Sequence, residues 1–197
     1  MIFSDSNRTG CLEFLFFGNS MKPTLLEGDL LEVEKFRPNS VKKGDILIIN
    51  TGYHKYGWDQ PEADERRYML RHPGPSMDFP EWVKSMEIKW IGVDCGSADH
   101  PMNTKIRDWE PGEAKLCDEY MQKKYGKSLN EIYEWPQTYQ AMHIHVFPQP
   151  HEIIHAENLG GQIGEVLNKR LIIGCFPWKF QGGESAFCRI IAFEEHE

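Results

Sequence analysis

The segment KGDILIINTG, residues 43–52, decides how this chain folds. Its four aliphatic residues, Ile46 to Ile49, follow a Gly-Asp pair and precede a Thr-Gly turn, a pattern typical of a short buried strand. A second segment of the same kind, KWIGVD at residues 89–94, also ends on an aspartate where the strand meets a loop. Together they predict a sheet with polar side chains at the ends of its strands.

Working outward, the same signals predict further strands at 30–33, 153–156, 171–175 and 187–193. Helices are expected at 79–86 and 113–125, the second ending at Gly126. The stretch 103–138 has little strand pattern and is interpreted as an insertion. We therefore expect an α/β protein in which one mixed sheet with flanking helices forms a single domain over residues 1–197.

Composition excludes several classes of protein. The 197 residues carry a net charge of -8 without a basic cluster, which argues against nucleic-acid binding. The apolar run at 12–17 is too short to span a bilayer, and the chain has no signal peptide pattern, so we expect no membrane partner. Its five cysteines are widely spaced and form no CxxC pair, which favours a reducing compartment. We expect a cytoplasmic protein.

A group of histidines ahead of a carboxylate is the main candidate for chemistry. MHIHVFP at 142–148 contains His143 and His145, and Glu157 follows an apolar strand. Imidazole and carboxylate ligands bind divalent metals, and a bound metal activates water for hydrolysis. The alternative for the histidines is a solvated strand end, where His143 and His145 share one face. Burying Glu157 is unfavourable unless it is paired or metal-bound.

A second motif, residues 18–29, resembles the nucleophile box of Ser-Lys peptidases, with Ser20 before Met21. Such a serine needs a lysine as its general base, and the corresponding position is Leu70. A peptidase using Ser20 is therefore a distant alternative, and a turn at Pro23 is the structural interpretation.

Several short motifs, taken in order, resemble one family. The Gly44-Asp45 strand ends in Thr51-Gly52, a Pro73-Gly74 pair precedes the Trp82 helix, and the 91–94 strand leads into a Ser-x-Asp turn at 97–99. Glu157 is followed by Asn-Leu, and the strand at 187–193 continues the pattern. Each motif is weak alone, but together they resemble the cyclase family of metal-dependent hydrolases, which includes kynurenine formamidase and isatin hydrolase, from about Gly44 onward.

The resemblance implies a cyclase-family fold and a metal site. Glu157 would be one ligand, with His143 or His145 as another; the usual spacing favours His145 and the local pattern favours His143. Asp99, His100 and His72 are candidates for the substrate pocket, with a structural turn as the alternative for Asp99. The metal would be zinc or manganese.

The family's N-terminal His-x-Gly-Thr-His-x-Asp-Ala-Pro segment has no counterpart, because the first histidine is His54 and no His-x-x-x-His-x-Asp occurs. The domain is therefore expected to be N-terminally incomplete, and the catalytic base is unassigned. The implied function is hydrolysis of an amide, lactam, imide or cyclic carbonyl in a small-molecule substrate. The chain would act as a homo-oligomer or with a second chain that completes the site. A degenerate, non-catalytic binding or structural partner is the alternative.

Overall fold

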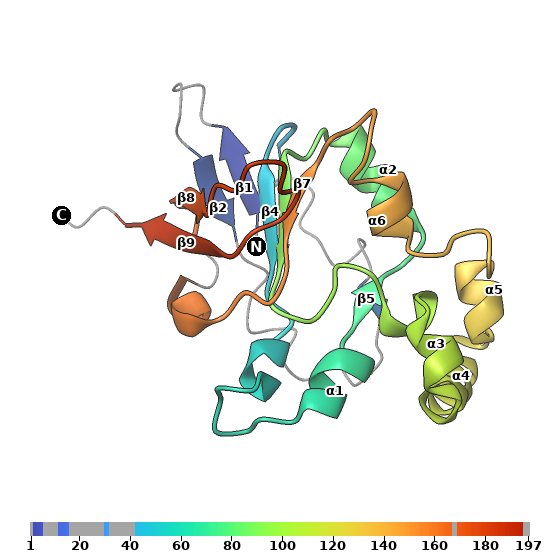
Figure 1. The fold of residues 1–197 in the computed structure, drawn as a ribbon. Helices are drawn as coiled ribbons and strands as arrows, with labels where there is room; N and C mark the ends of the chain where they lie inside the picture. The colour runs from blue at the N-terminus through green and yellow to red at the C-terminus, as the bar shows by residue number, and fades with distance from the viewer. Residues whose placement is uncertain (1, 6–11, 16–29, 32–41, 167–168, 195–197) are drawn as a thin grey trace.

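The computed structural model describes residues 2–5, 12–15, 30–31, 42–166 and 169–194 (Figure 1). Ser20 and the motif around it, together with the end of the predicted first strand at 32–33, lie outside these residues.

The described residues contain both strands and helices, as the sequence predicted. The strands are β1 Ile2–Asp5, β2 Leu12–Leu15, β3 Leu30–Leu31, β4 Ile46–Ile49, β5 Gly74–Pro75, β6 Trp90–Val93, β7 Ile154–Ala156, β8 Ile172–Pro177 and β9 Cys188–Phe193. The α-helices are α1 Glu65–Leu70, α2 Asp78–Ser85, α3 Ile106–Trp109, α4 Pro111–Tyr125, α5 Leu129–Tyr133 and α6 Ala141–His145. Short 3-10 helices are η4 Tyr53–Tyr56, η5 Pro101–Asn103 and η6 Gly161–Val166.

The main sheet has the strand order β2-β1-β4-β6-β7. Strands β4, β6 and β7 are parallel, with Ile46 opposite Trp90 and Trp90 opposite Ile154, while β1 is antiparallel to both β2 and β4. This confirms an α/β structure with a mixed sheet and flanking helices. The prediction of a single sheet is wrong in detail, since β3–β5 and β8–β9 form separate two-stranded pairs.

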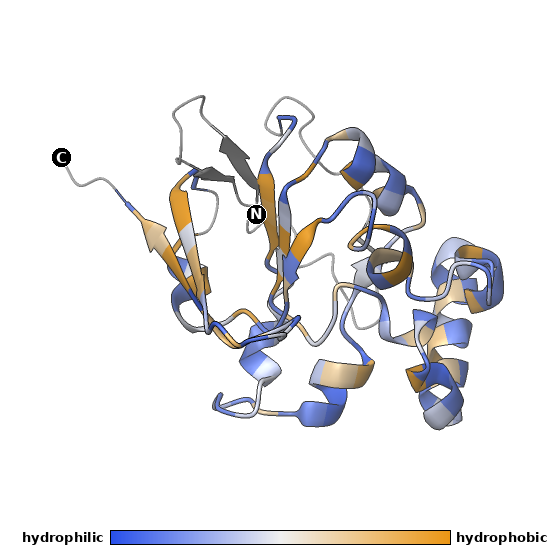
Figure 2. Ribbon diagram, turned by 45° about the horizontal axis from the view of Figure 1, so that its top comes forward, coloured by the Kyte–Doolittle hydropathy of each residue, from blue (hydrophilic) through white to orange (hydrophobic). Residues whose placement is uncertain are grey.

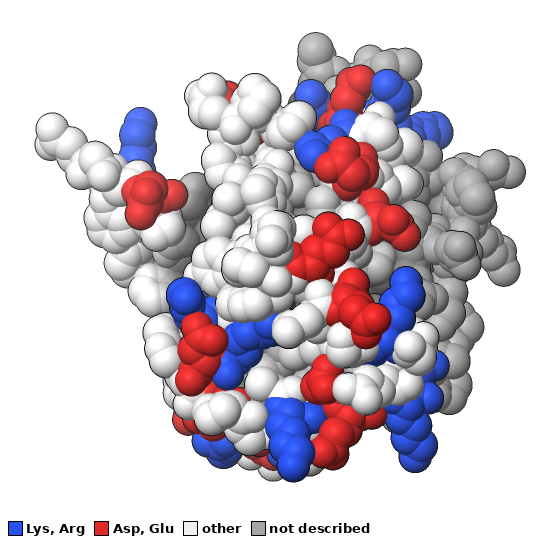
Figure 3. Space-filling model, turned by 90° about the vertical axis from the view of Figure 1, so that its right-hand side faces the viewer, with Lys and Arg blue, Asp and Glu red and all other residues white. Residues whose placement is uncertain are grey.

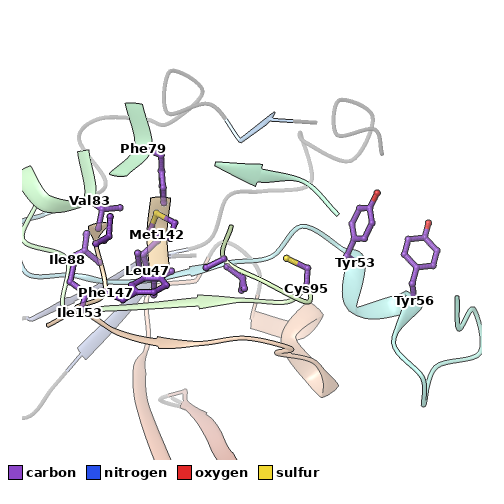
Figure 4. Close-up of a cluster of buried hydrophobic side chains, with 14 residues drawn as sticks. Leu47, Tyr53, Tyr56, Phe79, Val83, Ile88, Cys95, Met142, Phe147 and Ile153 are labelled. Carbon is purple, nitrogen blue, oxygen red and sulfur yellow. The ribbon is translucent and has the colours of Figure 1, made fainter. Parts of the chain in front are cut away.

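Alternate residues of the central strands pack on opposite faces of the sheet, as the period of two requires. Leu47 and Ile91 form one core with side chains of α2 and α6. Figure 4 shows Leu47 beside Val83 and Met142 of these helices. Ile46, Ile48 and Trp90 point the other way and pack against the β8–β9 hairpin. The hairpin covers a face of the sheet instead of extending its edge, which explains why it is separate.

The region predicted as an insertion, 103–138, holds α3, α4 and α5, which lie together at one side of the molecule (Figure 1). It builds a small core of its own from Met102, Met121, Leu129 and Tyr133. On the side of the molecule seen in Figure 3, acidic and basic side chains are interspersed without a broad basic area. No helix among the described residues is long and apolar enough to cross a membrane.

The Pro73-Gly74 turn gives a test of the packing between β5 and the loop after β6. A Cβ on Gly74 would lie 2.3 Å from both Cα and Cβ of His100. We expect Gly74→Ala to lower the free energy of unfolding by about 3 kcal/mol, because the clash involves backbone. Gly112→Ala in α4 is the matched control: no atom lies within 4 Å of its new Cβ, and the helix gains up to about 1 kcal/mol. Urea unfolding of both variants measures the difference, and equal stabilities would contradict this account.

Candidate metal centre

Three potential ligands meet at the carboxyl end of β7. Each of His143, His155 and Glu157 offers a ligand atom, and these atoms all lie within 4.8 Å of one another. His155 belongs to β7 and Glu157 follows its last residue, so both project from the same face of one strand. His143 approaches from α6, with Nε2 3.4 Å from Glu157 Oε1.

The geometry of α6 separates the two histidines between which the sequence could not choose. On the predicted strand end His143 and His145 would share a face, but residues 141–145 form a helix. Residues two apart on a helix lie about 200° apart around its axis. His143 therefore lies against Glu157 while His145 is exposed and stands outside the group. The alternative of a solvated strand end is wrong for residues 141–145, and in the structure His143 lies in the group of potential ligands while His145 lies outside it.

His155 is a residue that sequence reasoning missed. It is not among the candidates that the sequence provides, yet its ring packs edge-on against His143 at 4.9 Å between centroids and stacks on Phe147 at 4.1 Å. The signal was present in the sequence, because residues 155 and 157 are two apart on a strand and must share a face.

Asp99 fixes the position of His143. Its carboxylate is fully buried and accepts hydrogen bonds from the backbone N–H groups of Met142 and His143, at 2.9 and 3.2 Å. It also accepts the Nδ1–H of His143 at 2.7 Å, so in the neutral imidazole Nε2 carries no proton, and Nε2 is directed toward Glu157. A carboxylate behind a histidine in this way sets the tautomer of a metal ligand. Asp99 is thus a support for the group and not a wall of the pocket.

Burial and the charges within the group shift the pKa of both histidines. Burial lowers the pKa of His143, but the hydrogen bond and charge of Asp99, together with Glu157, outweigh burial and leave that pKa above its ordinary value. Burial, and then the positive charge of His143, lower the pKa of His155. His155 is therefore more readily available as a neutral imidazole, the form that binds metal.

A narrow, mainly apolar pocket adjoins the group. Its walls include Thr51, Cys95, Ala98 and Met142, from the ends of β4 and β6 and from α6. The N–H of Ala98 donates to Glu157 Oε1 at 2.8 Å, so the wall of the pocket also holds the carboxylate.

The two histidines predicted as pocket candidates are not among the residues that line this pocket. His72 is buried and donates its Nδ1–H to the Pro73 carbonyl at 2.9 Å. His100 is buried, accepts the Met102 N–H at 3.1 Å and contacts the Tyr133 ring. Both hold the loops behind the site together.

A second buried carboxylate organises the neighbouring strand ends. Asp94, directly after β6, accepts hydrogen bonds from the N–H and hydroxyl of Thr51 at 2.6 and 2.7 Å. It also accepts the N–H of Gly52 at 2.8 Å and the Nδ1–H of His54 at 2.8 Å. Gly52 has a φ of 81°, which favours glycine in this turn. The parallel strands β4 and β6 end at the same edge of the sheet, so the Thr51-Gly52 turn and Asp94 lie close enough to form these hydrogen bonds.

Comparison with known families supports the resemblance carried by these motifs. Residues 20–100 match the family described as "Putative cyclase". This part of the chain, less than half of its length, is similar to that family. The match begins earlier than the expected Gly44 and includes the Ser20 stretch that was weighed as a peptidase motif. No curated protein and no solved structure matches the chain.

The cyclase match contains Asp94, Asp99 and the buried histidines at 72 and 100, and ends before the group of potential ligands. Two hydrogen bonds connect this group to the matched residues. Asp99 accepts the Nδ1–H of His143, and the N–H of Ala98 donates to Glu157.

His72 makes the stability of the fold depend on pH. Burial lowers its pKa from 6.5 to about 4, so the folded protein keeps it neutral while the unfolded chain protonates it. The free energy of unfolding should therefore fall as pH drops below 6.5 and level off below about 4, by about 3 kcal/mol in all. His72→Asn keeps an N–H for the Pro73 carbonyl but cannot be protonated. In urea unfolding between these pH values, the wild type should lose stability relative to this variant, and a constant gap would show that His72 is not responsible.

Asp99→Asn tests the support of His143. An amide N–H in place of the carboxylate oxygen would donate to Nδ1 and move the histidine proton to Nε2, which then cannot bind a metal. We expect the affinity for Zn²⁺ or Mn²⁺, measured by calorimetry, to fall by about 10–100-fold. The control is Asp108→Asn, because Asp108 forms an exposed ion pair with Lys105. This variant should bind the metal with the affinity of the wild type. Unchanged affinity in a folded Asp99→Asn protein would remove Asp99 from this role.

Proposed function

We propose that this chain is a metal-dependent hydrolase that acts on an amide, lactam, imide or cyclic carbonyl group. The observation that carries the proposal is the convergence of His143, His155 and Glu157 beside a buried carboxylate and an apolar pocket. The similarity of residues 20–100 to the cyclase family points in the same direction.

The donor set fits a divalent metal ion. Two imidazoles and one carboxylate are a known ligand set for catalytic zinc, and three protein ligands leave a position open for water or substrate. These donors suit manganese as well, so zinc and manganese both remain in the proposal. When bound, such an ion supplies Lewis acidity that polarises a carbonyl and activates water.

The protein's own groups would prepare this site. Asp99 holds the Nδ1–H of His143, which keeps Nε2 available, and the N–H of Ala98 holds one oxygen of Glu157. The apolar side chains of Cys95, Ala98 and Met142 lie beside the group and would exclude bulk water from it.

His155 bears on the missing family segment. Without His155, this group would offer only His143 and Glu157 as ligands, which is fewer than a catalytic zinc normally has. With it, the group reaches three ligands from one short stretch of the chain. We therefore propose that ion binding needs no further segment, while the catalytic base is still to be found, in this chain or a second one.

Metal content and hydrolysis test the proposal together. Purified protein should hold about one Zn²⁺ or Mn²⁺ per chain and should hydrolyse one class in a panel of an N-formyl aromatic amide, a lactam and a cyclic imide, with the products separated by liquid chromatography. His143→Ala and Glu157→Gln should lose both the metal and the hydrolysis. His145→Ala, on the opposite side of α6, is the matched control and should keep both.

Two outcomes would contradict the proposal in different ways. Stoichiometric metal without hydrolysis of any substrate would favour the non-catalytic alternative, in which the chain is a binding partner. Absence of metal after incubation with excess zinc or manganese would remove the site itself.

A further inference from the structure

Two of the described cysteines lie close together on the β8–β9 hairpin. Cys175 of β8 lies opposite Ile190 of β9. Cys188 precedes Ile190 by two residues and lies opposite Pro177. Opposite residues share a face of the hairpin, and so do residues two apart on one strand, so the two cysteines are diagonal neighbours on one face. Ile190 packs toward the main sheet from this face, whereas both cysteines lie farther along it and are exposed.

The hydrogen-bonding pattern of the hairpin brings the two side chains near each other. The N–H of Trp178 donates to the Phe187 carbonyl at 3.0 Å, which makes these residues a hydrogen-bonded pair. Pairs alternate along an antiparallel ladder, so the pairs that contain Cys175 and Cys188 are not hydrogen-bonded, and in such pairs the strands approach more closely. Pro177 agrees with this assignment, because a residue in such a pair directs its N–H away from the partner strand and proline has no N–H.

The two thiols are also in direct contact. Partial burial of its sulfur raises the pKa of the Cys175 thiol to about 11, and the second cause is its hydrogen bond with Cys188. The Cys175 thiol therefore keeps its proton and donates it to the Cys188 sulfur. Because both residues are exposed, an ion in solution can reach the two sulfurs.

The cysteine pair has no third ligand within the part of the chain that the structure describes. In that part, three or more histidine, cysteine or carboxylate side chains meet only in the group of His143, His155 and Glu157. That group lies on the α6 side of the main sheet, and the hairpin packs on the opposite side. Zinc takes at least three protein ligands, so the two cysteines alone do not form a zinc site. Two thiolates suit a soft ion that accepts two-coordinate binding, and Cu⁺ is such an ion.

The spacing of the strands favours a bridging ion over a disulfide. Diagonal neighbours lie about 7–8 Å apart, whereas the Cα atoms of a disulfide are usually about 4.4–6.8 Å apart and its sulfurs about 2 Å apart. Two metal–sulfur bonds of about 2.3 Å each join sulfurs that are up to about 4.6 Å apart. Two thiols in hydrogen-bond contact are therefore spaced for an ion without a shift of the strands.

We propose that Cys175 and Cys188 bind one Cu⁺ ion at a site separate from the candidate metal centre. One Cu⁺ and two thiols give a two-coordinate, singly negative bis-thiolate complex and two protons, with no change in oxidation state. Both strands of the hairpin are largely hydrophobic in Figure 2, so few oxygen ligands compete with the sulfurs. The ladder sets the spacing of the two sulfurs before the ion binds, which lowers the entropic cost of binding.

Competition for Cu⁺ between the full chain and the chelator bicinchoninate tests this site. Under reducing, oxygen-free conditions the wild type should take up about one thiolate-bound Cu⁺ per chain, seen as an ultraviolet charge-transfer band. Cys175→Ser and Cys188→Ser should each lower the affinity by at least about 100-fold, because the remaining thiol loses the advantage of a linked second ligand. Circular dichroism establishes that each variant is folded, and alanine replaces serine in any variant that is not.

Two control variants separate this site from the other potential ligands. Cys117→Ser is the matched control, because Cys117 is a half-buried cysteine in α4, and it should bind Cu⁺ as the wild type does. His143→Ala removes a ligand of the candidate metal centre and should leave the thiolate band unchanged. The test involves no hydrolysis, so its failure is distinct from failure of the proposed function.

Three results would overturn the proposal. These are a wild type without the thiolate band, a band that persists in both folded hairpin variants, and a loss that Cys117→Ser shows equally. Trypsin detects the competing disulfide, because it cuts after Lys179, between the two cysteines. If the wild type binds no Cu⁺, and its tryptic peptides after treatment with hydrogen peroxide stay joined until they are reduced, the pair forms a disulfide instead.

Discussion

The parallel alignment of β4, β6 and β7 is the constraint on which the site depends. Parallel strands end at one edge, so the residues that follow each strand must come together there. In this protein these are Thr51 after β4, Asp94 after β6 and Glu157 after β7. Segments more than a hundred residues apart along the chain therefore supply one small region of polar chemistry on top of an apolar core.

Two buried aspartates make that edge rigid. Asp94 uses both oxygens to hold the Thr51-Gly52 turn and His54, and Asp99 uses both to hold the start of α6 and the ring of His143. A buried carboxylate is unfavourable unless its oxygens are satisfied, and here each accepts several hydrogen bonds. The same contacts that stabilise these carboxylates orient the side chains proposed to bind metal.

The two faces of the main sheet are covered by different elements. One is covered by α2 and α6, which bring His143 to the edge, and the other by the β8–β9 hairpin. A two-stranded hairpin has two faces of its own and can bury only one against the sheet. Its second face is aromatic and exposed.

The sequence by itself determined the strands β4, β6, β7, β8 and β9, the helices α2 and α4, and Glu157 as a candidate ligand, because these depend on local apolar patterns and caps. It left the choice between His143 and His145 open, because the family's usual spacing favours His145 and the local pattern favours His143. Which of the two lies beside Glu157 depends on the helix at residues 141–145, and so short a segment carries too weak a period to be predicted. Only the tertiary structure set His145 apart from the group, brought His155 into it and placed Asp99 behind His143. Those outcomes depend on contacts between distant segments: a histidine becomes a potential ligand through what the fold places beside it.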